Sequence, residues 1–328
     1  MHLITGPTGL VGSHLALELI RQKEPVRLLQ RDVHRTEDLD RLLDHYGVKV
    51  EAPVERMACD ILDPLGLEEA MRGVSDVYHA AAHISFDPRD SDLLWEVNVT
   101  GTANMVNASL NAGIDRFCHV SSIAALGPQH GETPVNEDSP WENDADLSDY
   151  ARSKYEAELE VYRGSAEGLR TVIVCPSVII GPCRQGRSTR TLLDRVIGGT
   201  LFHPPGSTHV VDVRDVAELS VRLMSEGLPG ERYVLAGPQV AYKNLFHQIA
   251  RAAGGSHSRF TLQRWMLELA WRADRIRGLL TGSRSLITRH TARTAMRDRR
   301  FDDRKVREQL GASMRSVDDM VSNAVSFC

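Results

Sequence analysis

Strand-like and helix-like segments alternate along the first half of the chain, and this alternation limits the available folds more than any other feature. Short apolar runs predict strands at residues 2–5, 25–30, 54–59, 76–79, 116–120 and 171–175. Helix-like stretches separate them, and the longest runs from about Asp90 to Ala112. Parallel strands joined by helical crossovers have helices on both faces of the sheet. We therefore expect an α/β fold built on a doubly wound parallel sheet.

A glycine-rich turn, Gly6-Pro7-Thr8-Gly9-Leu10-Val11-Gly12, separates the first expected strand from the first expected helix. Glycine lets the backbone approach a pyrophosphate closely, and a helix N-terminus offers N–H groups and a favourable dipole. We therefore expect a dinucleotide site here, made by Gly6, Thr8, Gly9, Leu10, Val11 and Gly12. The alternative is a tight turn that binds no ligand. Pro7 removes one N–H, which could alter the affinity without preventing the turn.

The alternation ends after Gly181. Residues 182–205 are rich in glycine, proline and basic residues, and from about Tyr242 the pattern is mainly helical and rich in arginine. We expect residues 1–181 to form a dinucleotide-binding domain of the Rossmann type, and residues 182–328 to form mostly a smaller, mainly helical substrate lobe. Two later segments, Val210–Val216 and Tyr233–Ala236, are expected to return to the first domain, near residues 210–220 and 232–237.

The end of the second expected strand, Leu28-Leu29-Gln30-Arg31, bears on the choice between NAD and NADP. Sites for NAD usually place an acid here to bind the ribose, but no acid occurs before Asp32. Arg31 and Arg35 could instead pair with a 2′-phosphate, which suits a guanidinium. We expect NADP(H) to be preferred, with NAD(H) as the second option. Two simply solvated arginines are the alternative.

Tyr150 and Lys154 are four residues apart in an expected helix, so their side chains lie on one face. A free tyrosine has a pKa of about 10, and a neighbouring cation favours the phenolate and brings the group toward neutral pH. Ser121 and Ser122 follow the fifth expected strand, at the sheet edge where parallel sheets present catalytic groups. This pattern predicts acid–base chemistry by Tyr150, with a serine that holds the substrate oxygen. An exposed helical pair without a role is the alternative.

With these features the chain resembles the extended short-chain dehydrogenase/reductase family, or NAD-dependent epimerase/dehydratase superfamily, over nearly its whole length. The matching segments occur in the family's order: the glycine turn, Cys59-Asp60-Ile61, His79-Ala80-Ala81-Ala82, Asn98-Val99-Thr100-Gly101-Thr102, the serines, Tyr150 with Lys154, and Pro176 through Pro182. The resemblance implies that Ser122 is the catalytic serine, that Lys154 also holds the nicotinamide ribose, and that Asn98 steadies a helix and a proton path. It further implies cofactor contacts by Asp60 and Ile61 at the adenine, by Ala80, Ala81 and Ala82 at the pyrophosphate and ribose, and by Pro176 and Val178 at the nicotinamide.

Within that family, Phe301-Asp302-Asp303-Arg304-Lys305 and the segments around Tyr150 and Pro176 are most similar to dihydroflavonol reductases and 3β-hydroxysteroid dehydrogenases. The resemblance implies hydride transfer from NADPH to a ketone or aldehyde, or the reverse oxidation of a secondary alcohol, with Tyr150 as acid/base. Two alternatives stay open: an NAD-dependent nucleotide-sugar epimerase, and a cofactor-binding protein without catalysis.

The composition limits the kinds of partner and environment that we expect for this chain. The 328 residues carry a formal net charge of -5, which gives no reason to expect nucleic acid. Five scattered cysteines include no C-x-x-C pair, so we expect neither a disulfide framework nor a metal site. The strand at residues 2–5 leaves no room for a signal peptide, and no apolar stretch approaches roughly 18 residues, so a soluble cytoplasmic protein is expected. The resemblance implies a homodimer through the helices that begin near Asp90 and Tyr150.

The substrate is a small molecule whose identity the pattern leaves open. His83 is the best candidate contact besides Ser122, because it lies near an expected pocket loop. Apolar residues at helical spacing over residues 262–280 predict a helix packed on the second lobe, or a lid over a hydrophobic substrate. The arginines between Arg284 and Arg307 could meet an anionic part of the substrate, and a solvated helical face is the alternative.

Overall fold

Seven parallel strands form the central sheet of the structure, a computed structural model that describes residues 1–131, 133–142, 147–183, 190–255, 258–281 and 288–327. The strands are β1 (His2–Thr5), β2 (Val26–Gln30), β3 (Val54–Ala58), β4 (Asp76–His79), β5 (Arg116–Val120), β6 (Arg170–Pro176) and β10 (Glu231–Leu235). Their order is β10-β6-β5-β4-β1-β2-β3, and every neighbouring pair is parallel. The chain winds outward from β1 in both directions, so the predicted doubly wound sheet is confirmed.

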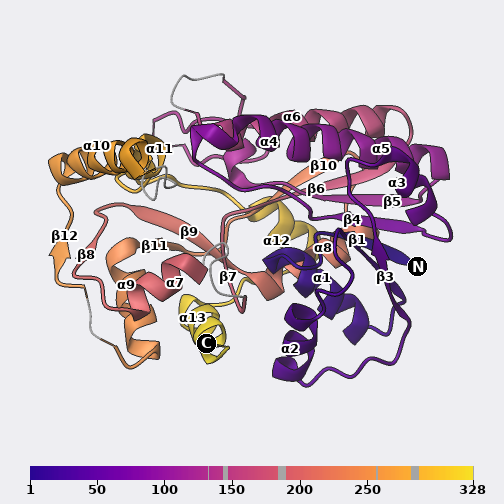
Figure 1. Cartoon of the computed structure of the whole chain (residues 1–328), viewed down its shortest axis with the longest axis horizontal. Helices are drawn as coiled ribbons and strands as arrows, with labels where there is room; N and C mark the ends of the chain where they lie inside the picture. Colours follow the sequence, from indigo (N-terminus) through magenta and orange to yellow (C-terminus); the bar gives the residue numbers. More distant parts are fainter. Residues whose placement is uncertain (132, 143–146, 184–189, 256–257, 282–287, 328) are drawn as a thin grey trace.

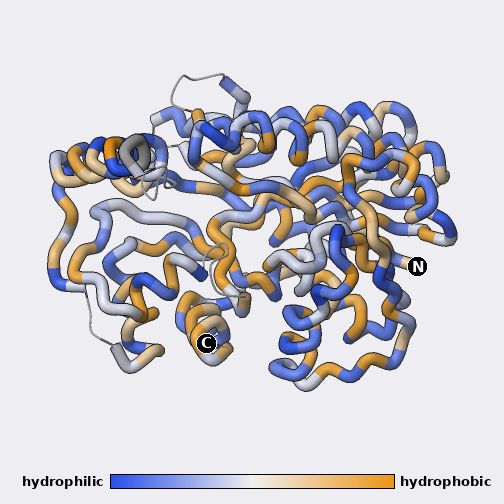
Figure 2. Tube along the Cα trace, in the orientation of Figure 1, coloured by the Kyte–Doolittle hydropathy of each residue, from blue (hydrophilic) through white to orange (hydrophobic). Residues whose placement is uncertain are grey.

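Helices cover both faces of this sheet (Figure 1). One face carries α3 (Pro64–Ala70), α4 (Ser91–Leu94), α5 (Gly101–Ala112) and α6 (Asp149–Ala166), and the other carries α1 (Leu10–Arg21), α2 (Glu37–Tyr46), α8 (Val213–Glu226) and α12 (Arg304–Leu310). Between α4 and α5 the backbone forms a π-helical segment, η2 (Trp95–Thr100). Hydrophobic and hydrophilic stretches alternate along the helices above the sheet (Figure 2), as expected when one helix face packs on a core.

Successive side chains of the strands enter two different cores. In β4, Val77 packs on the side of α3 and α5, whereas Tyr78 packs on the side of α1 and α8. In β5, Phe117 and Cys118 divide in the same way. All four are buried because the sheet is covered on both faces, which explains why these central strands carry apolar residues on both sides.

The second half of the chain adds smaller elements. A three-stranded sheet has the order β11-β9-β7, and β8 pairs with β12. The strands are β7 (Val178–Ile180), β8 (Phe202–His203), β9 (Ser207–Asp212), β11 (Gln239–Ala241) and β12 (Phe260–Thr261), and the helices are α7 (Arg190–Ile197), α9 (Tyr242–Ala252), α10 (Arg264–Thr281), α11 (Arg289–Thr294) and α13 (Val317–Ser326). None of the helices within the described ranges is long and apolar enough to cross a membrane.

The two expected returns to the large sheet differ in outcome. Residues 233–235 belong to β10, which pairs with β6, so this return occurs. The expected return of Val210–Val216 to the large sheet is wrong for the sheet itself, because residues up to Asp212 belong to β9, which pairs with β7 and β11. The chain leaves the large sheet after Pro176 and continues as β7, and β9 pairs with β7. From Val213 onward the chain is helix α8, which packs on α1. The division into two lobes at residue 181 stays a prediction.

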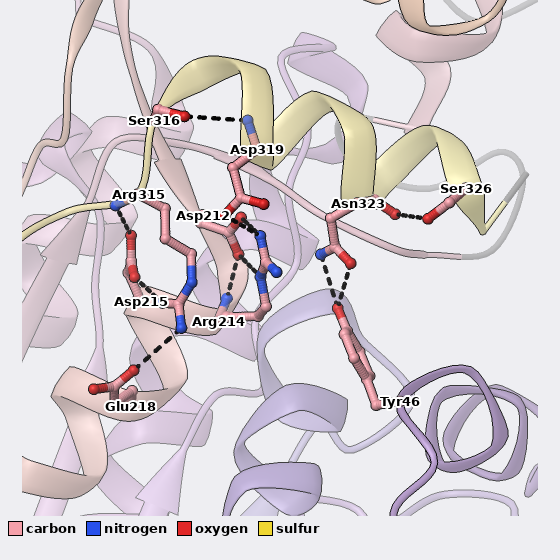
Figure 3. Close-up of polar contacts among 10 residues, drawn as sticks. All are labelled: Tyr46, Asp212, Arg214, Asp215, Glu218, Arg315, Ser316, Asp319, Asn323 and Ser326. Atoms are coloured by element: carbon pink, nitrogen blue, oxygen red, sulfur yellow. Dashed lines mark hydrogen bonds and ion pairs between the residues drawn. The ribbon is translucent and has the colours of Figure 1, made fainter.

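Helix α13 is joined to α8 by charged side chains (Figure 3). The Arg214 guanidinium donates to both carboxylate oxygens of the buried Asp212, at 2.9 and 2.6 Å, and contacts Asp319 of α13 at 3.1 Å. The Tyr46 hydroxyl of α2 bonds the Asn323 amide of α13. These contacts hold the last helix beside the helices that follow the glycine turn.

Helix α10 spans the predicted 262–280 helix, but several of its apolar side chains, including Trp265, Leu269 and Ile276, are exposed. The side chain of Leu280, part of the expected apolar stripe, lies outside the described residues, as does Arg284. The stripe therefore does not form the fully packed face that its spacing predicts.

Candidate active site

Tyr150 lies in the first turn of α6. This helix begins where Ser148 accepts a hydrogen bond from the Ala151 N–H at 3.1 Å, an N-cap that satisfies one of the free donors of the first turn. Ser122 follows β5 and accepts from the Ala124 N–H, which opens the 3₁₀ turn η3 (Ile123–Ala125). The phenol of Tyr150 lies near the Ser122 hydroxyl, which acts to lower the pKa of the phenol. The structure thus brings together these two predicted site residues, which are distant in sequence.

Lys154 stands one helical turn after Tyr150 and is almost completely buried. Its ammonium donates to the Val120 carbonyl at 2.8 Å, at the end of β5, and lies 3.4 Å from His119 Nε2. Burial lowers the pKa of Lys154 to about 8, although the carboxylate of Glu158 opposes this effect. The ammonium therefore stays charged at neutral pH at a cost in desolvation.

The pKa of Tyr150 departs from our expectation. Burial raises it to about 12, and only Ser122 opposes this. Lys154, whose ammonium donates to the Val120 carbonyl, does not contribute the expected lowering. The phenol is therefore neutral at pH 7 and carries a proton.

The two serines have different partners. Ser121 donates to the carboxylate of Glu158, which also contacts the Arg232 guanidinium at 3.3 Å. Glu158 is fully buried and stands a further turn along α6 from Lys154, a spacing of four residues that the sequence displayed and our sequence analysis did not use. Because Ser121 is held by Glu158, the hydroxyl beside the phenol is that of Ser122.

Asn98 lies in the π-helical segment η2 and joins two elements of the site. Its side-chain oxygen accepts from the His83 N–H at 2.7 Å, and its amide nitrogen donates to the His83 carbonyl and to Ser153 of α6. These three bonds tie the loop after β4 to the helix that carries Tyr150. The imidazole of His83 lies 3.7 Å from Asp90 and does not line the cavity described below.

A buried chain of hydrogen bonds that sequence reasoning missed runs beneath the site. Thr102 donates to the Asn98 carbonyl, so its oxygen accepts from His79 Nε2 at 3.0 Å. His79 Nδ1 is then the acceptor for the hydroxyl of Thr5 at 2.8 Å. This order requires a neutral imidazole, in agreement with its burial, which lowers the pKa of His79 to about 3.

The same chain supports the loop after β4. The oxygen of Thr5 accepts from the N–H groups of Ala80 and Ala81 at 3.1 and 3.0 Å. Thr5 precedes the glycine turn directly, so the turn and residues 80–82 lie side by side at the carboxyl edge of the sheet. One continuous network therefore connects the expected phosphate-binding turn to Asn98.

The glycine turn has the close backbone approach that a dinucleotide site requires. Gly6 has φ +66°, which favours glycine, and its carbonyl accepts from the Gly9 N–H at 2.9 Å. A Cβ on Gly6 would lie 2.9 Å from the Ala81 backbone, and one on Gly12 would lie 2.2 Å from the Gly6 carbonyl oxygen. Gly9 is the N-cap residue of α1 and has no side chain that could accept a hydrogen bond from the first N–H groups of the helix. The turn therefore fits the pyrophosphate of NAD(P).

The other residues of the turn differ in their surroundings. Val11 packs on the core beneath α1. Thr8 and Leu10 line a narrow crevice together with Asp38 of α2 and Phe327 at the end of the chain.

The remaining predicted cofactor residues lie at the carboxyl ends of strands. Asp60 and Ile61 come just after the edge strand β3, and the Asp60 carboxylate accepts from the Leu62 N–H. Pro176 ends β6 and is buried, and Val178 begins β7, which belongs to the three-stranded sheet. An extended ligand along this edge would pass all the predicted positions, from β3 to β6.

Arg31 follows β2 directly and is exposed. It has no hydrogen bond or ion pair with any residue in the described part of the chain, and the same holds for the side chain of Arg35. The Asp32 carboxylate accepts from the His34 N–H. Two guanidinium groups are therefore available where the ribose of an adenosine would lie.

A cavity of about 720 Å³ opens beside the first turn of α6. Its lining includes Phe86, Leu94, Leu126 and Asp149, and the ring of Phe86 packs edge-on against Tyr150 at 5.7 Å between centroids. No group of three metal-binding side chains occurs among the residues that the structure describes. Tyr150 and Ser122 are not among its lining residues, so the space of substrate size reaches the phenol only through Phe86, which lines the cavity and contacts the Tyr150 ring.

Comparisons with known proteins agree with this arrangement. Residues 2–236 match the model of the NAD dependent epimerase/dehydratase family. The chain is 30% identical over 331 residues to sterol demethylase protein B of Methylococcus capsulatus, which covers 99% of this chain and 97% of that protein. It is 29% identical over 247 residues to cinnamoyl-CoA reductase 1 of Oryza sativa, covering 71% of this chain and 70% of the relative. The crystal structure of gox2253 superposes with a TM-score of 0.80 at 29% identity, covering 100% and 97% of the two chains.

Proposed function

The chain belongs to the NAD dependent epimerase/dehydratase family, and on that premise we propose that it is an NADP(H)-dependent reductase of ketones or aldehydes, which also catalyses the reverse oxidation of a secondary alcohol. Membership makes it an NAD(P)-dependent enzyme of the short-chain dehydrogenase/reductase type. The observation that carries the finer proposal is a neutral, buried Tyr150 phenol near Ser122, in contact with the ring of Phe86, which lines a cavity of about 720 Å³.

The proposed role of Tyr150 as proton donor agrees with the protonation state of its phenol. A group whose pKa burial has raised to about 12 holds its proton at pH 7, so it can donate to a carbonyl oxygen that gains charge. Ser122 holds the same oxygen in position. Lys154 provides a fixed positive charge one helical turn away, at its Nζ atom, which donates a hydrogen bond to the Val120 carbonyl. NADPH supplies the hydride when it is bound, and the protein supplies position and charge.

The proposed preference for NADPH rests on the end of β2. Arg31 and Arg35 have no carboxylate partner within the described residues, and Asp32 is engaged by a backbone N–H. A 2′-phosphate beside Arg31 would gain a charge-assisted hydrogen bond, whereas a ribose hydroxyl would meet no acid there. The relatives named as reductases support the reductase branch over the epimerase branch.

The test is a fluorescence titration of the purified protein with NADPH and NADH, followed by a screen of ketones and aldehydes for NADPH oxidation. We expect NADPH to bind at least about tenfold more tightly than NADH, and Arg31→Ala to remove most of that difference. Arg27→Ala, on the same strand but paired with Glu55, is the matched control and should leave the preference intact. Tightly held NAD that survives purification, with no net turnover of added nicotinamide, would refute the proposal in favour of an epimerase.

A further inference from the structure

One wall of the cavity beside Tyr150 is rich in arginine. Four guanidinium side chains line it, from Arg289 and Arg293 of α11 and from Arg297 and Arg299 in the segment that follows. The sequence analysis left open whether the late arginines meet an anion or only solvent. Their place in the cavity wall distinguishes these four from arginines on an outer helix face.

Arg299 is held in an unusual environment for a cation. Its guanidinium donates to the Gly127 carbonyl at 3.0 Å and lies 4.9 Å above the ring of Phe301. It makes no ion pair with any carboxylate of the residues that the structure describes. Burial lowers the pKa of Arg299, and the positive charge of Arg297 lowers it further.

Carboxylates also line the cavity, but within the described residues none of them forms an ion pair with Arg299. They are Asp87, which is paired with Arg89 at 2.6 Å, and Asp149 and Asp298. A half-buried guanidinium next to a second cation is costly unless an anion joins it. Such an arrangement is what a site for an anionic ligand requires before the ligand binds.

The lining also has apolar members, which include Phe86, Leu94, Leu126 and Pro128. The ring of Phe86 meets the Tyr150 ring edge-on and stacks on the imidazole of His290, which lies 5.7 Å away at an interplanar angle of 15°. The row from Tyr150 through Phe86 to His290 therefore leads from the proton donor to helix α11. The cavity combines apolar and cationic side chains.

We propose that this cavity selects substrates with an anionic group, a carboxylate or a phosphate, on a largely apolar body: Arg299 and Arg297 bind the anion, and the body lies against Phe86 and Leu126. The inference rests on the proposed function, since it takes this cavity as the substrate site. It specifies a substrate class that the family alone does not define.

The test measures binding directly and does not depend on turnover. The protein with saturating NADP⁺, which keeps the probes out of the cofactor site, is titrated calorimetrically with biphenyl-4-carboxylate, biphenyl-4-carboxamide and biphenyl-4-yl phosphate. We expect the carboxylate or the phosphate to bind at least about tenfold more tightly than the neutral amide, as a charge-assisted hydrogen bond implies. Whichever anion binds more tightly identifies the group.

Variants assign the preference to the arginine wall. Arg299→Gln should abolish most of the preference for the anion, and Arg297→Gln should reduce it. The second variant covers the case in which loss of the bond to Gly127 destabilises the first. Arg275→Gln is the matched control, because Arg275 is exposed on α10 and does not line the cavity. Tyr150→Phe should keep the preference.

Equal affinity for the carboxylate, the phosphate and the amide in the native protein would overturn this inference, as would a preference that persists in both Arg299→Gln and Arg297→Gln. Failure of the proposed function has a different signature, because an absence of carbonyl reduction together with an intact preference for the anion would refute the reductase and leave the anion site in place.

Discussion

Replacing the buried lysine of the site by methionine should remove one specific pH dependence from the stability of the protein. Lys154 is 1% exposed, and burial lowers its pKa from 10.5 to about 8. Between these values the unfolded chain binds more protons than the folded one, so the stability contributed by this group rises with pH. Holding the ammonium charged costs about 3 kcal/mol at pH 7 and less than about 1 kcal/mol at pH 10.

Lys154→Met lacks this cost at every pH. The free energy of unfolding of the native protein, minus that of the variant, should therefore rise by roughly 2 to 3 kcal/mol from pH 7 to pH 10. The dependence of the hydrogen bond to the Val120 carbonyl on the charge of Lys154 is already contained in this pKa, and effects of the substitution that do not change with pH cancel in this comparison. Urea unfolding followed by circular dichroism at the two pH values measures the difference.

The matched control for this prediction is Lys243→Met. Lys243 is exposed on α9, so the variant should differ from the native protein by nearly the same amount at both pH values. A flat difference for Lys154→Met as well would refute the reasoning, since it would mean that the ammonium is not held charged in a buried site.

Three further perturbations test other parts of the structure. Gly12→Ala places a Cβ 2.2 Å from the Gly6 carbonyl oxygen, so it should weaken NADPH binding by at least about tenfold in a fluorescence titration, and unchanged affinity would contradict the close packing of the turn. His79→Leu removes a group that must stay neutral when folded, because burial lowers its pKa from 6.5 to about 3. The native protein should therefore lose about 2 kcal/mol more stability than this variant from pH 7 to pH 5, and equal losses in urea unfolding would contradict the buried neutral imidazole. Arg214→Gln leaves the buried Asp212 carboxylate without its main partner and should destabilise the protein by about 3 kcal/mol, with faster proteolysis near α13; resistance equal to that of the native protein would show that the contacts in Figure 3 do not hold this helix.

Local features of the fold were predictable from the sequence because they depend on neighbouring residues. The strands from β1 to β6 are short apolar runs, and the turn at Gly6 requires glycine for its positive φ and its close backbone contacts. The pairing of Tyr150 with Lys154 follows from helical spacing alone. In each case the signal lies within a few residues.

Features that depend on long-range contacts were not predictable. The move of β9 into the second sheet depends on the course of the chain after Pro176, which apolar periodicity does not encode. The bond of Ser121 to Glu158 and the raised pKa of Tyr150 depend on burial produced by the complete fold. The sequence identified the late arginines as a group, but only the structure assigned Arg299 to the cavity wall.

The central claim is that Tyr150 donates a proton while NADPH reduces a carbonyl, and one labelling experiment tests it most directly. The protein is incubated with NADPH deuterated at the transferring position and with the ketone or aldehyde that the screen selects, and the product alcohol is examined by mass spectrometry. We predict one deuterium on the carbinol carbon, and a rate of label transfer at least about 100-fold lower in Tyr150→Phe at unchanged NADPH affinity. An unlabelled product, or label transfer at the native rate in Tyr150→Phe, would contradict the account.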